Sequence, residues 1–290
     1  MIPSPAVIHT ARKLLRVIPL PVARALAAVG GALAWALQGD RRRALLESLS
    51  YTAPERASEH GLLARRTFRN MAVTAVDLFR LPDMGKKELQ SLFEIRGIEN
   101  LIEAQSKGRG TVIATAHLGP YELASACLAS MDHLGYTTYG MMEDLDPKVL
   151  EALATYRAAT GMQLINIKDG LRATYRVLGE GHIVCLVGDR VVGDTKGTME
   201  VPFAGGRRAV PTGPAVLAQG TGAALVTAFT SPNPGGKARY MIQFDPPIYA
   251  EGRGSEERER LMKVIVERMS AEVRRNPDQW FVFQPNWIKT

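Results

Sequence analysis

The residues around His117 constrain the fold most, because a buried strand there runs directly into a helix. Residues 110–116 are a short apolar run rich in β-branched side chains, which is typical of a strand inside a sheet. Gly119 and Pro120 are favourable residues for the start of a helix, which we predict over 121–131. This order of elements places His117 at the carboxyl end of a parallel strand, where open α/β sheets bind their ligands.

Strands and helices alternate through the rest of the chain, as judged from apolar runs and helical periodicity. The predicted strands are 92–96, 136–142, 164–167, 182–187, 223–229 and 240–244, and the predicted helices are 98–106, 147–160, 170–178, 214–219 and 255–275. Such an order is typical of an α/β fold, and we predict an α/β/α sandwich with a largely parallel central sheet. The Gly-rich residues 188–212 predict an irregular segment.

The N-terminal part, residues 5–81, has helical character throughout. Residues 17–37 are apolar and long enough to cross a bilayer, but they contain Arg24 and have basic residues on both sides. Basic flanks at both ends favour a helix that lies in an anionic membrane surface, with a spanning helix and a buried helix as the second and third alternatives. We therefore divide the chain into an N-terminal helical, membrane-associating region (1–85) and an α/β domain (86–290).

The formal charge of +7 indicates a basic surface, which suits nucleic acid, anionic lipid or an acidic carrier protein. Nucleic acid is not expected as a partner, because the aromatic and basic motifs of nucleic-acid modules are absent from the sequence. Cys127 and Cys185 lie in apolar segments and are predicted to be reduced core residues of a cytoplasmic protein. No metal is expected, since no Cys/His cluster has the spacing of metal ligands.

The pair His117 and Glu122 has a definite chemical use. A carboxylate beside an imidazole holds it in one tautomer and stabilises its protonated form, so the histidine becomes a general base. Such a base removes the proton of a substrate hydroxyl, which then attacks an activated acyl group directly, without an acyl-enzyme. The alternative is an ordinary helix start with an unrelated His and Glu, because the His-x4-Glu spacing alone is a weak pattern.

Several further blocks occur in the order found in one known family. The blocks are 117–122, 161–166, 186–190, 201–205, 210–218, 221–225 and 276–280, followed by Trp287. Together they extend over roughly the whole chain after Arg41. On these residues the chain resembles the bacterial lipid A biosynthesis lauroyl/myristoyl acyltransferase family, which includes the mycobacterial phosphatidylinositol mannoside acyltransferases.

The resemblance implies a membrane-associated enzyme on the cytoplasmic face of the bacterial inner membrane. It implies transfer of a fatty acyl group from a thioester, either acyl carrier protein (acyl-ACP) or acyl-CoA, to a hydroxyl of a glycolipid, with no other cofactor. Two departures concern the acceptor. Asp189-Arg190 stands where lipid A enzymes usually have Asp-Gln, and Pro120-Tyr121 stands where they often have Asn-Trp. The arginine and the residues 210–215 are closer to the mannoside branch.

The resemblance also implies roles for individual residues. His117 is expected to be the general base, Glu122 to orient it, and Asp189 to pair with His117 or with Arg157. Arg157 and Arg190 are expected to bind the phosphate of the donor or the headgroup of the acceptor.

Two further expectations come from the residues alone. Gly119 and the backbone amides at the helix start are candidates to hold an oxyanion. Lys196, Arg207 and Arg208 lie in the predicted irregular segment, where they contact lipid headgroups or an acidic carrier, or belong to a solvated loop.

Two alternatives to an acyltransferase stay open at this point. The first is a thioesterase or lipid esterase that uses His117 to activate water; the absence of Gly-x-Ser-x-Gly argues against the serine type. The second is a non-catalytic lipid-binding protein. The joint presence of His117, Glu122 and Asp189 argues against it, because a binding protein has no need of all three.

Overall fold

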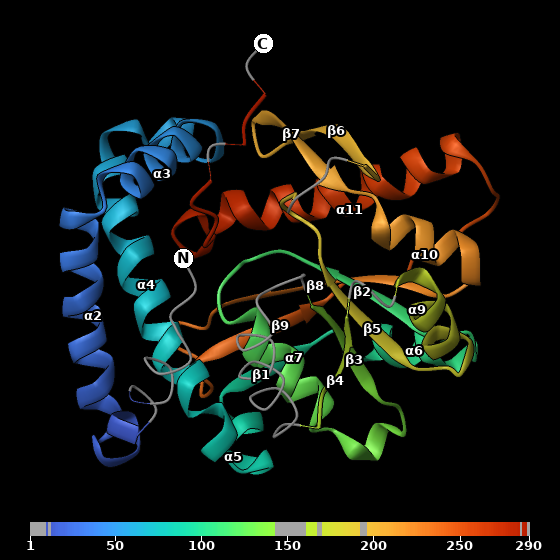
Figure 1. Cartoon of the computed structure of the whole chain (residues 1–290), viewed down its shortest axis with the longest axis horizontal. Coiled ribbons are helices and arrows are strands. Elements are labelled where there is room, and N and C mark those ends of the chain that lie inside the picture. The colour runs from blue at the N-terminus through green and yellow to red at the C-terminus, as the bar shows by residue number, and fades with distance from the viewer. Residues whose placement is uncertain are drawn as a thin grey trace.

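The computed structural model describes residue 10 and residues 13–142, 161–166, 170–191, 196–284 and 286–288. It shows helices at the N-terminal side and around a central sheet (Figure 1). The helices are α2 (Leu20–Leu37), α3 (Gly39–Thr52), α4 (His60–Arg80), α5 (Lys86–Ser91), α6 (Ile98–Ser106), α7 (Tyr121–Ala129), α9 (Gly170–Gly179), α10 (Gly213–Thr221) and α11 (Ser255–Arg275). The strands are β1 (Phe93–Arg96), β2 (Thr111–Thr115), β3 (Thr138–Met142), β4 (Gln163–Asn166), β5 (Ile183–Val187), β6 (Thr198–Phe203), β7 (Gly206–Pro211), β8 (Ala224–Pro232) and β9 (Tyr240–Phe244).

The central sheet has seven strands in the order β1-β9-β8-β2-β5-β3-β4. The strands from β8 to β4 are parallel. Strand β9 is antiparallel to β8, and β1 is parallel to β9. The prediction of a mixed α/β fold with a largely parallel central sheet is therefore confirmed.

Strand β2 lies in the middle of the sheet, and every one of its residues is buried. Its side chains enter two different cores, because successive residues of a strand point to opposite faces. Ile113 shares a buried cluster with Leu101 of α6 and Leu123 of α7. Ala114 shares another with Ile265 of α11. Helices thus cover both faces of the sheet, and the carboxyl end of β2 lies between the two layers of helices.

Strands β6 and β7 form an antiparallel hairpin, so the prediction of an irregular segment is wrong for residues 198–211. The chain turns at Ala204 and Gly205, whose φ angles are +46° and +102°. Position 205 requires glycine, because a Cβ there would lie 2.3 Å from the carbonyl oxygen of Tyr51. Phe203 anchors the hairpin in the core that contains α11. In the sequence, the glycines and charged residues between the apolar positions obscure the alternation of apolar and polar residues that is typical of a strand.

In the N-terminal part, α2 packs along α4, and the two helices lie side by side at the left of Figure 1. Gly31 permits this close approach, since a Cβ there would lie 2.7 Å from the carbonyl oxygen of Phe68. Arg24 forms an ion pair of 2.7 Å with the buried Asp77 of α4. Asp77 also accepts a hydrogen bond of 2.8 Å from Tyr240 of β9. This polar network connects the N-terminal helices to the sheet.

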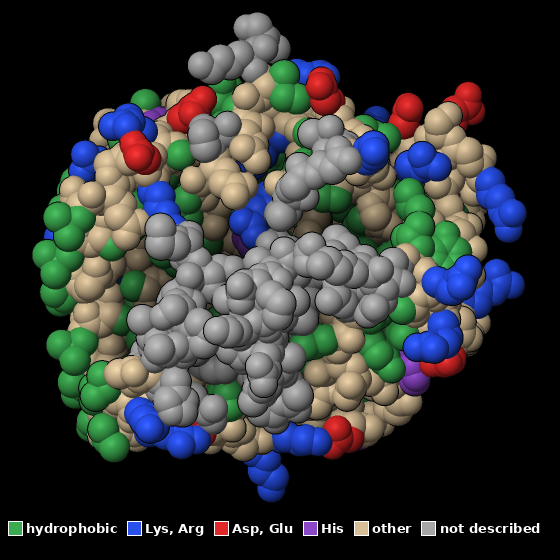
Figure 2. Space-filling view, in the orientation of Figure 1, with side chains coloured by type: hydrophobic (Ala, Val, Ile, Leu, Met, Phe, Trp, Pro, Cys, Tyr) green, Lys and Arg blue, Asp and Glu red, His purple; other side chains and the backbone are tan. Residues whose placement is uncertain are grey.

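The opposite face of α2 is apolar and exposed. Figure 2 shows hydrophobic side chains along the left margin, over α2. The large exposed ones follow one another at intervals of three or four residues, namely Val22, Leu26, Val29, Leu33 and Leu37. By length and composition alone, α2 is able to cross a membrane. In the folded chain, one side of α2 is bound to α4 and the other presents an apolar stripe, which we call the α2 stripe.

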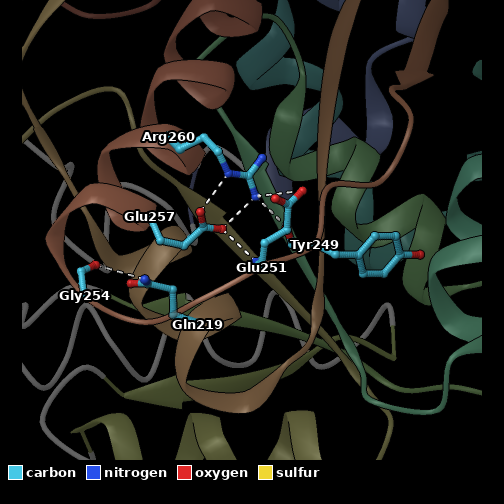
Figure 3. Close-up of polar contacts among 6 residues, drawn as sticks. All are labelled: Gln219, Tyr249, Glu251, Gly254, Glu257 and Arg260. Atoms are coloured by element: carbon cyan, nitrogen blue, oxygen red, sulfur yellow. Dashed lines mark hydrogen bonds and ion pairs between the residues drawn. The ribbon is translucent and has the colours of Figure 1, made fainter.

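A polar cluster fixes the loop that enters α11 (Figure 3). Arg260 donates hydrogen bonds to the Tyr249 carbonyl at 2.7 Å and to the Glu257 carboxylate at 2.7 and 2.8 Å. Glu257 also accepts the backbone N–H of Glu251 at 2.9 Å. The hydrogen bond from Arg260, followed by the one from Glu251, lowers the pKa of Glu257 to about 2. The cluster sets the start of α11, whose other end leads to residues 277–280 at the candidate site.

Candidate active site

His117 and Asp189 meet at the carboxyl ends of two neighbouring parallel strands. Thr115 of β2 pairs with Val187 of β5, so the residues two positions beyond each strand lie side by side. Nδ1 of His117 lies 2.5 Å from Oδ1 of Asp189. The backbone N–H of His117 donates to Oδ2 of the same carboxylate at 2.9 Å. The sheet register thus builds a histidine–carboxylate dyad from residues 72 positions apart.

The C-terminal segment braces this dyad. The indole Nε1–H of the buried Trp280 donates to Oδ2 of Asp189 at 2.7 Å. The backbone N–H of Phe281 donates to the carbonyl of His117 at 2.8 Å. Both oxygens of Asp189 are therefore engaged, and the orientation of the carboxylate is set from three sides.

The electrostatics of Asp189 favour its ionised form. Its side chain is 0% exposed, and burial by itself raises a carboxyl pKa. The attraction of His117 and the hydrogen bonds from His117 and Trp280 outweigh burial and lower the pKa of Asp189 to about 2. With the carboxylate ionised at neutral pH, Nδ1 of His117 carries the proton and Nε2 has the lone pair that a general base needs.

Glu122 has a side-chain contact with the neighbouring residue of α7. Its carboxylate accepts a hydrogen bond of 3.3 Å from the hydroxyl of Tyr121. The carboxylate on Nδ1 of His117 is that of Asp189, which β5 brings there across the sheet. The position that orients His117 is thus taken by Asp189, and a catalytic role for Glu122 stays a prediction.

Gly119 does not have a free amide for an oxyanion, which corrects our expectation. Its N–H donates to the carbonyl of Gln279 at 2.8 Å, as part of the contact between the motif and the C-terminal segment. Its φ of +56° lies in the left-handed region that favours glycine, and a Cβ there would lie 3.1 Å from Oγ1 of Thr230. Gly119 therefore shapes the turn between β2 and α7.

The structure describes only one of the two arginines of the predicted site. Arg190 follows Asp189 directly and is half-buried at the same edge of the sheet. Arg157 lies outside the residues that the structure describes. The binding roles of both stay predictions. Within the described ranges, no group of three or more His, Cys, Asp or Glu residues has the arrangement of a metal site.

Two small apolar cavities lie beside Tyr121, with volumes of about 40 and 30 Å³. Four residues line both cavities, namely Thr115, Tyr121, Ser125 and Cys185. Tyr121 also contacts the His117 ring edge to face, with 5.1 Å between the ring centroids. The cavities lie between α7 and the sheet, and Tyr121 connects them to the imidazole.

Two residues of this region have surroundings that the sequence did not predict. Trp280 belongs to a block shared with the resembling family, but nothing in that block indicates that its indole binds Asp189. Arg208 was expected in a loop, yet its side chain is 0% exposed on β7. Its guanidinium lies 5.0 Å from the ring centroid of Trp280 and 4.8 Å from that of Trp287. Two adjacent arginines in a Gly-rich stretch carry no sequence signal of burial.

These features define an α/β protein with an Asp–His dyad at the carboxyl ends of parallel strands. Its carboxylate is buried and its imidazole is partly exposed, an arrangement suited to general-base chemistry. In the described part of the chain the imidazole contacts Asp189 and Tyr121, and neither is a serine or cysteine nucleophile. The family model for bacterial lipid A biosynthesis acyltransferases matches residues 7–289, and the chain belongs to that family. The predicted family is therefore confirmed.

Two mycobacterial proteins are among its relatives. The chain is 29% identical over 231 residues to a phosphatidylinositol mannoside acyltransferase of Mycobacterium tuberculosis (strain CDC 1551 / Oshkosh), with 73% of this chain and 66% of the relative covered. It is 28% identical over 218 residues to the phosphatidylinositol mannoside acyltransferase of Mycolicibacterium smegmatis, with 73% and 68% covered. The chain thus spans about two thirds of the length of these relatives.

Proposed function

We propose that this protein transfers a fatty acyl group from an acyl thioester to a hydroxyl of a glycolipid at a membrane surface. The observation that carries the proposal is the His117–Asp189 dyad at the strand ends, in a chain of this acyltransferase family. The acyl donor is acyl-ACP or acyl-CoA. The acceptor is a lipid A precursor or a phosphatidylinositol mannoside, and the mannoside class has the support of the relatives' names.

The dyad suggests a direct mechanism. Nε2 of His117 takes the proton of the acceptor hydroxyl while that oxygen attacks the thioester carbonyl carbon. The resulting tetrahedral intermediate expels the thiolate, which receives the proton from the imidazolium. Asp189 stabilises the imidazolium throughout, and its ionised state fits that task. No bond between the enzyme and the acyl group is required.

The apolar cavities beside Tyr121 are the proposed entrance of the acyl chain. Because Tyr121 lines both cavities and contacts the His117 ring, we expect the thioester carbonyl to lie near Nε2 when the chain points between α7 and the sheet. A whole fatty acyl chain needs more volume than the two cavities have. Met162, which lines the larger one, has the unbranched and flexible side chain that lets such a space widen. Arg157 and Arg190 are the proposed partners of anionic groups on donor or acceptor.

We further propose that α2 lies in the membrane surface and does not cross it. A helix that crossed the membrane would have to leave α4. This would break the ion pair between Arg24 and Asp77 and leave the buried carboxylate of Asp77 without the charge of Arg24. The α2 stripe meanwhile offers a continuous apolar face to lipid. Following the family resemblance, we assign the protein to the cytoplasmic face of the bacterial inner membrane.

The decisive experiment incubates the purified full chain with radiolabelled acyl-ACP or acyl-CoA and a panel of acceptors. The panel contains a lipid A precursor, a phosphatidylinositol mannoside and a lysophospholipid, with products separated by chromatography. We expect a labelled glycolipid from the wild-type protein and none from His117→Ala. His133→Ala is the matched control, because His133 is exposed on the turn Asp132–Leu134, outside the dyad.

Three other outcomes would contradict the proposal in different ways. Transfer by a folded His117→Ala variant would show that His117 is not the general base. Release of free fatty acid without a labelled glycolipid would identify a thioesterase or esterase. A lack of turnover with either donor and every acceptor would favour a non-catalytic lipid-binding protein.

A further inference from the structure

Arg208 is an anomaly in the core of this protein. Its side chain is 0% exposed, and none of its three guanidinium nitrogens has a hydrogen-bond partner within the described structure. Buried charges normally have a paired opposite charge or several hydrogen bonds, because removing an ion from water is costly. The unusual surroundings of Arg208 therefore call for an explanation.

Aromatic rings enclose the guanidinium. Its central carbon lies 4.8 Å from the ring centroid of Trp287, 5.0 Å from that of Trp280 and 6.0 Å from that of Phe203. Cation–π attraction of this kind offsets part of the lost hydration. Burial lowers the pKa of Arg208 to about 10, while attraction to Asp189 opposes the lowering. The side chain is thus cationic at neutral pH.

Trp280 connects this cation to the dyad. The guanidinium approaches the indole ring, and the Nε1–H of the same indole donates to Oδ2 of Asp189 at 2.7 Å. Asp189 is also 0% exposed, so little water screens the two charges from each other. Arg208 and Asp189 together form a buried pair of opposite charges with a shared aromatic ring.

We propose that Arg208 is a positioning residue, the buried counter-charge that keeps the His117–Asp189 dyad free of an extra proton at neutral pH. The inference rests on the proposed function, in which His117 is the base. With Arg208 present, the buried charges of Asp189 and Arg208 cancel while His117 is neutral. Without Arg208, the dyad would hold an uncompensated negative charge and would take up a proton at a higher pH. A dyad with that proton has no lone pair for the acceptor hydroxyl.

Tyr121, Glu122 and Arg190 also lie near the dyad, and each of them is partly exposed, whereas Arg208 is 0% exposed. Tyr121 contacts the His117 ring and donates to Glu122, and both residues lie on α7. Arg190 follows Asp189 in the chain and is half-buried. Arg208 differs from these groups because it reaches Asp189 through Trp280, from the hairpin side.

The test compares Arg208→Met with Arg207→Met. Both variants lose one arginine from β7, but the side chain of Arg207 is 45% exposed and pairs with Glu200 at 3.8 Å. We expect the acid limb of the kcat/KM profile of Arg208→Met to move up by about one pH unit. This shift corresponds to about a tenfold loss on the acid side and convergence with the wild-type protein at high pH. Arg207→Met should leave the position of the acid limb unchanged, whatever its effect on the level of activity, and Arg208→Lys, which keeps the charge, should restore the wild-type position in part.

Two further measurements separate this inference from the proposed function and from a structural role. The His117 imidazole is titrated by NMR, with its signal assigned from the spectrum of His117→Ala, and we expect its midpoint to rise in Arg208→Met. That readout holds even if the acyltransferase assay fails. Thermal unfolding is expected to show some loss of stability in Arg208→Met, because removing one partner of a buried charge pair leaves the other charge uncompensated. A purely structural role would lower stability as well, but it would not move the pH profile or the NMR midpoint. An unchanged pH profile and an unchanged NMR midpoint in Arg208→Met would overturn the proposal.

Discussion

Replacing Asp189 by asparagine tests the geometry of the dyad, because only one orientation of the side-chain amide satisfies the hydrogen bonds at this position. Oδ2 accepts two hydrogen bonds, from the His117 N–H at 2.9 Å and from Trp280 at 2.7 Å. The amide oxygen of Asn must take that position, since an NH₂ group there would face two donors. The NH₂ group then points at Nδ1 of His117, which lies 2.5 Å from Oδ1 in the wild-type protein.

This orientation reverses the tautomer of His117. Nδ1 has to accept the hydrogen bond from the amide, so the proton moves to Nε2 and the lone pair of the base is lost. The same change in a serine-protease triad lowers kcat by about 10⁴. We expect a loss of about 10³- to 10⁴-fold in kcat/KM, or roughly 4–5 kcal/mol of transition-state stabilisation.

The variant also changes the pH dependence of stability. The pKa of Asp189 is lowered in the fold to about 2 from an ordinary value of 3.8. The ionised group therefore stabilises the fold above the unfolded pKa, and this contribution is lost as the pH falls toward 2. Its size is about 2 kcal/mol. Urea unfolding between pH 5 and pH 2 should show this loss in the wild-type protein and a correspondingly smaller loss in Asp189→Asn.

The assay follows acyl transfer at saturating donor and compares Asp189→Asn with Asp245→Asn. Asp245 also accepts a side-chain hydrogen bond, from Thr227 at 2.6 Å. It follows β9, which runs antiparallel to β8, so the carboxyl end of β9 points away from the carboxyl ends of β2 and β5. A folded Asp189→Asn variant that retains more than a tenth of wild-type kcat/KM would refute the tautomer argument.

Two further predictions concern the N-terminal helices. Asp77→Ala removes the buried partner of Arg24 and Tyr240, so we expect urea unfolding to show a loss of about 3 kcal/mol, against less than about 1 kcal/mol for Asp40→Ala at an exposed ion pair. Equal losses would contradict the role of the Asp77 network. Leu26→Asp with Leu33→Asp removes two members of the α2 stripe and should weaken sedimentation with anionic vesicles at least about 30-fold, whereas Ile102→Asp on α6 should not. Unchanged sedimentation of the double variant would place the membrane contact elsewhere.

The sequence predicts the strands and the meeting of His117 with Asp189 for a clear physical reason. Each residue ends a short apolar run, and the carboxyl ends of parallel strands share one edge of a sheet. The register of β2 and β5 then brings together two residues at the same offset from the paired positions Thr115 and Val187. The periodicity of residues 255–275 likewise predicts α11 with the bounds that the structure has.

The partner of His117 is harder to predict, because local spacing and sheet register point to different carboxylates. Glu122 is close in sequence, but Asp189 is adjacent in the sheet. The order of strands, which decides between them, is not encoded in any short segment. The burial of Arg208 is hard to predict for a related reason. It depends on contacts with Trp280 and Trp287, which lie about 70 to 80 positions further along the chain.

Different segments of the chain contribute different groups to the site. The strand ends supply the groups of the dyad, and their placement follows from the sheet. The hairpin and the C-terminal segment supply Arg208 and Trp280, which touch Asp189 or its hydrogen-bond partner and exclude water from it. Since a buried carboxylate is stabilised only while such partners stay in place, the basicity of His117 depends on segments that carry no catalytic group. Variation in the hairpin is therefore a means of tuning the pH range of acyl transfer without altering the dyad itself.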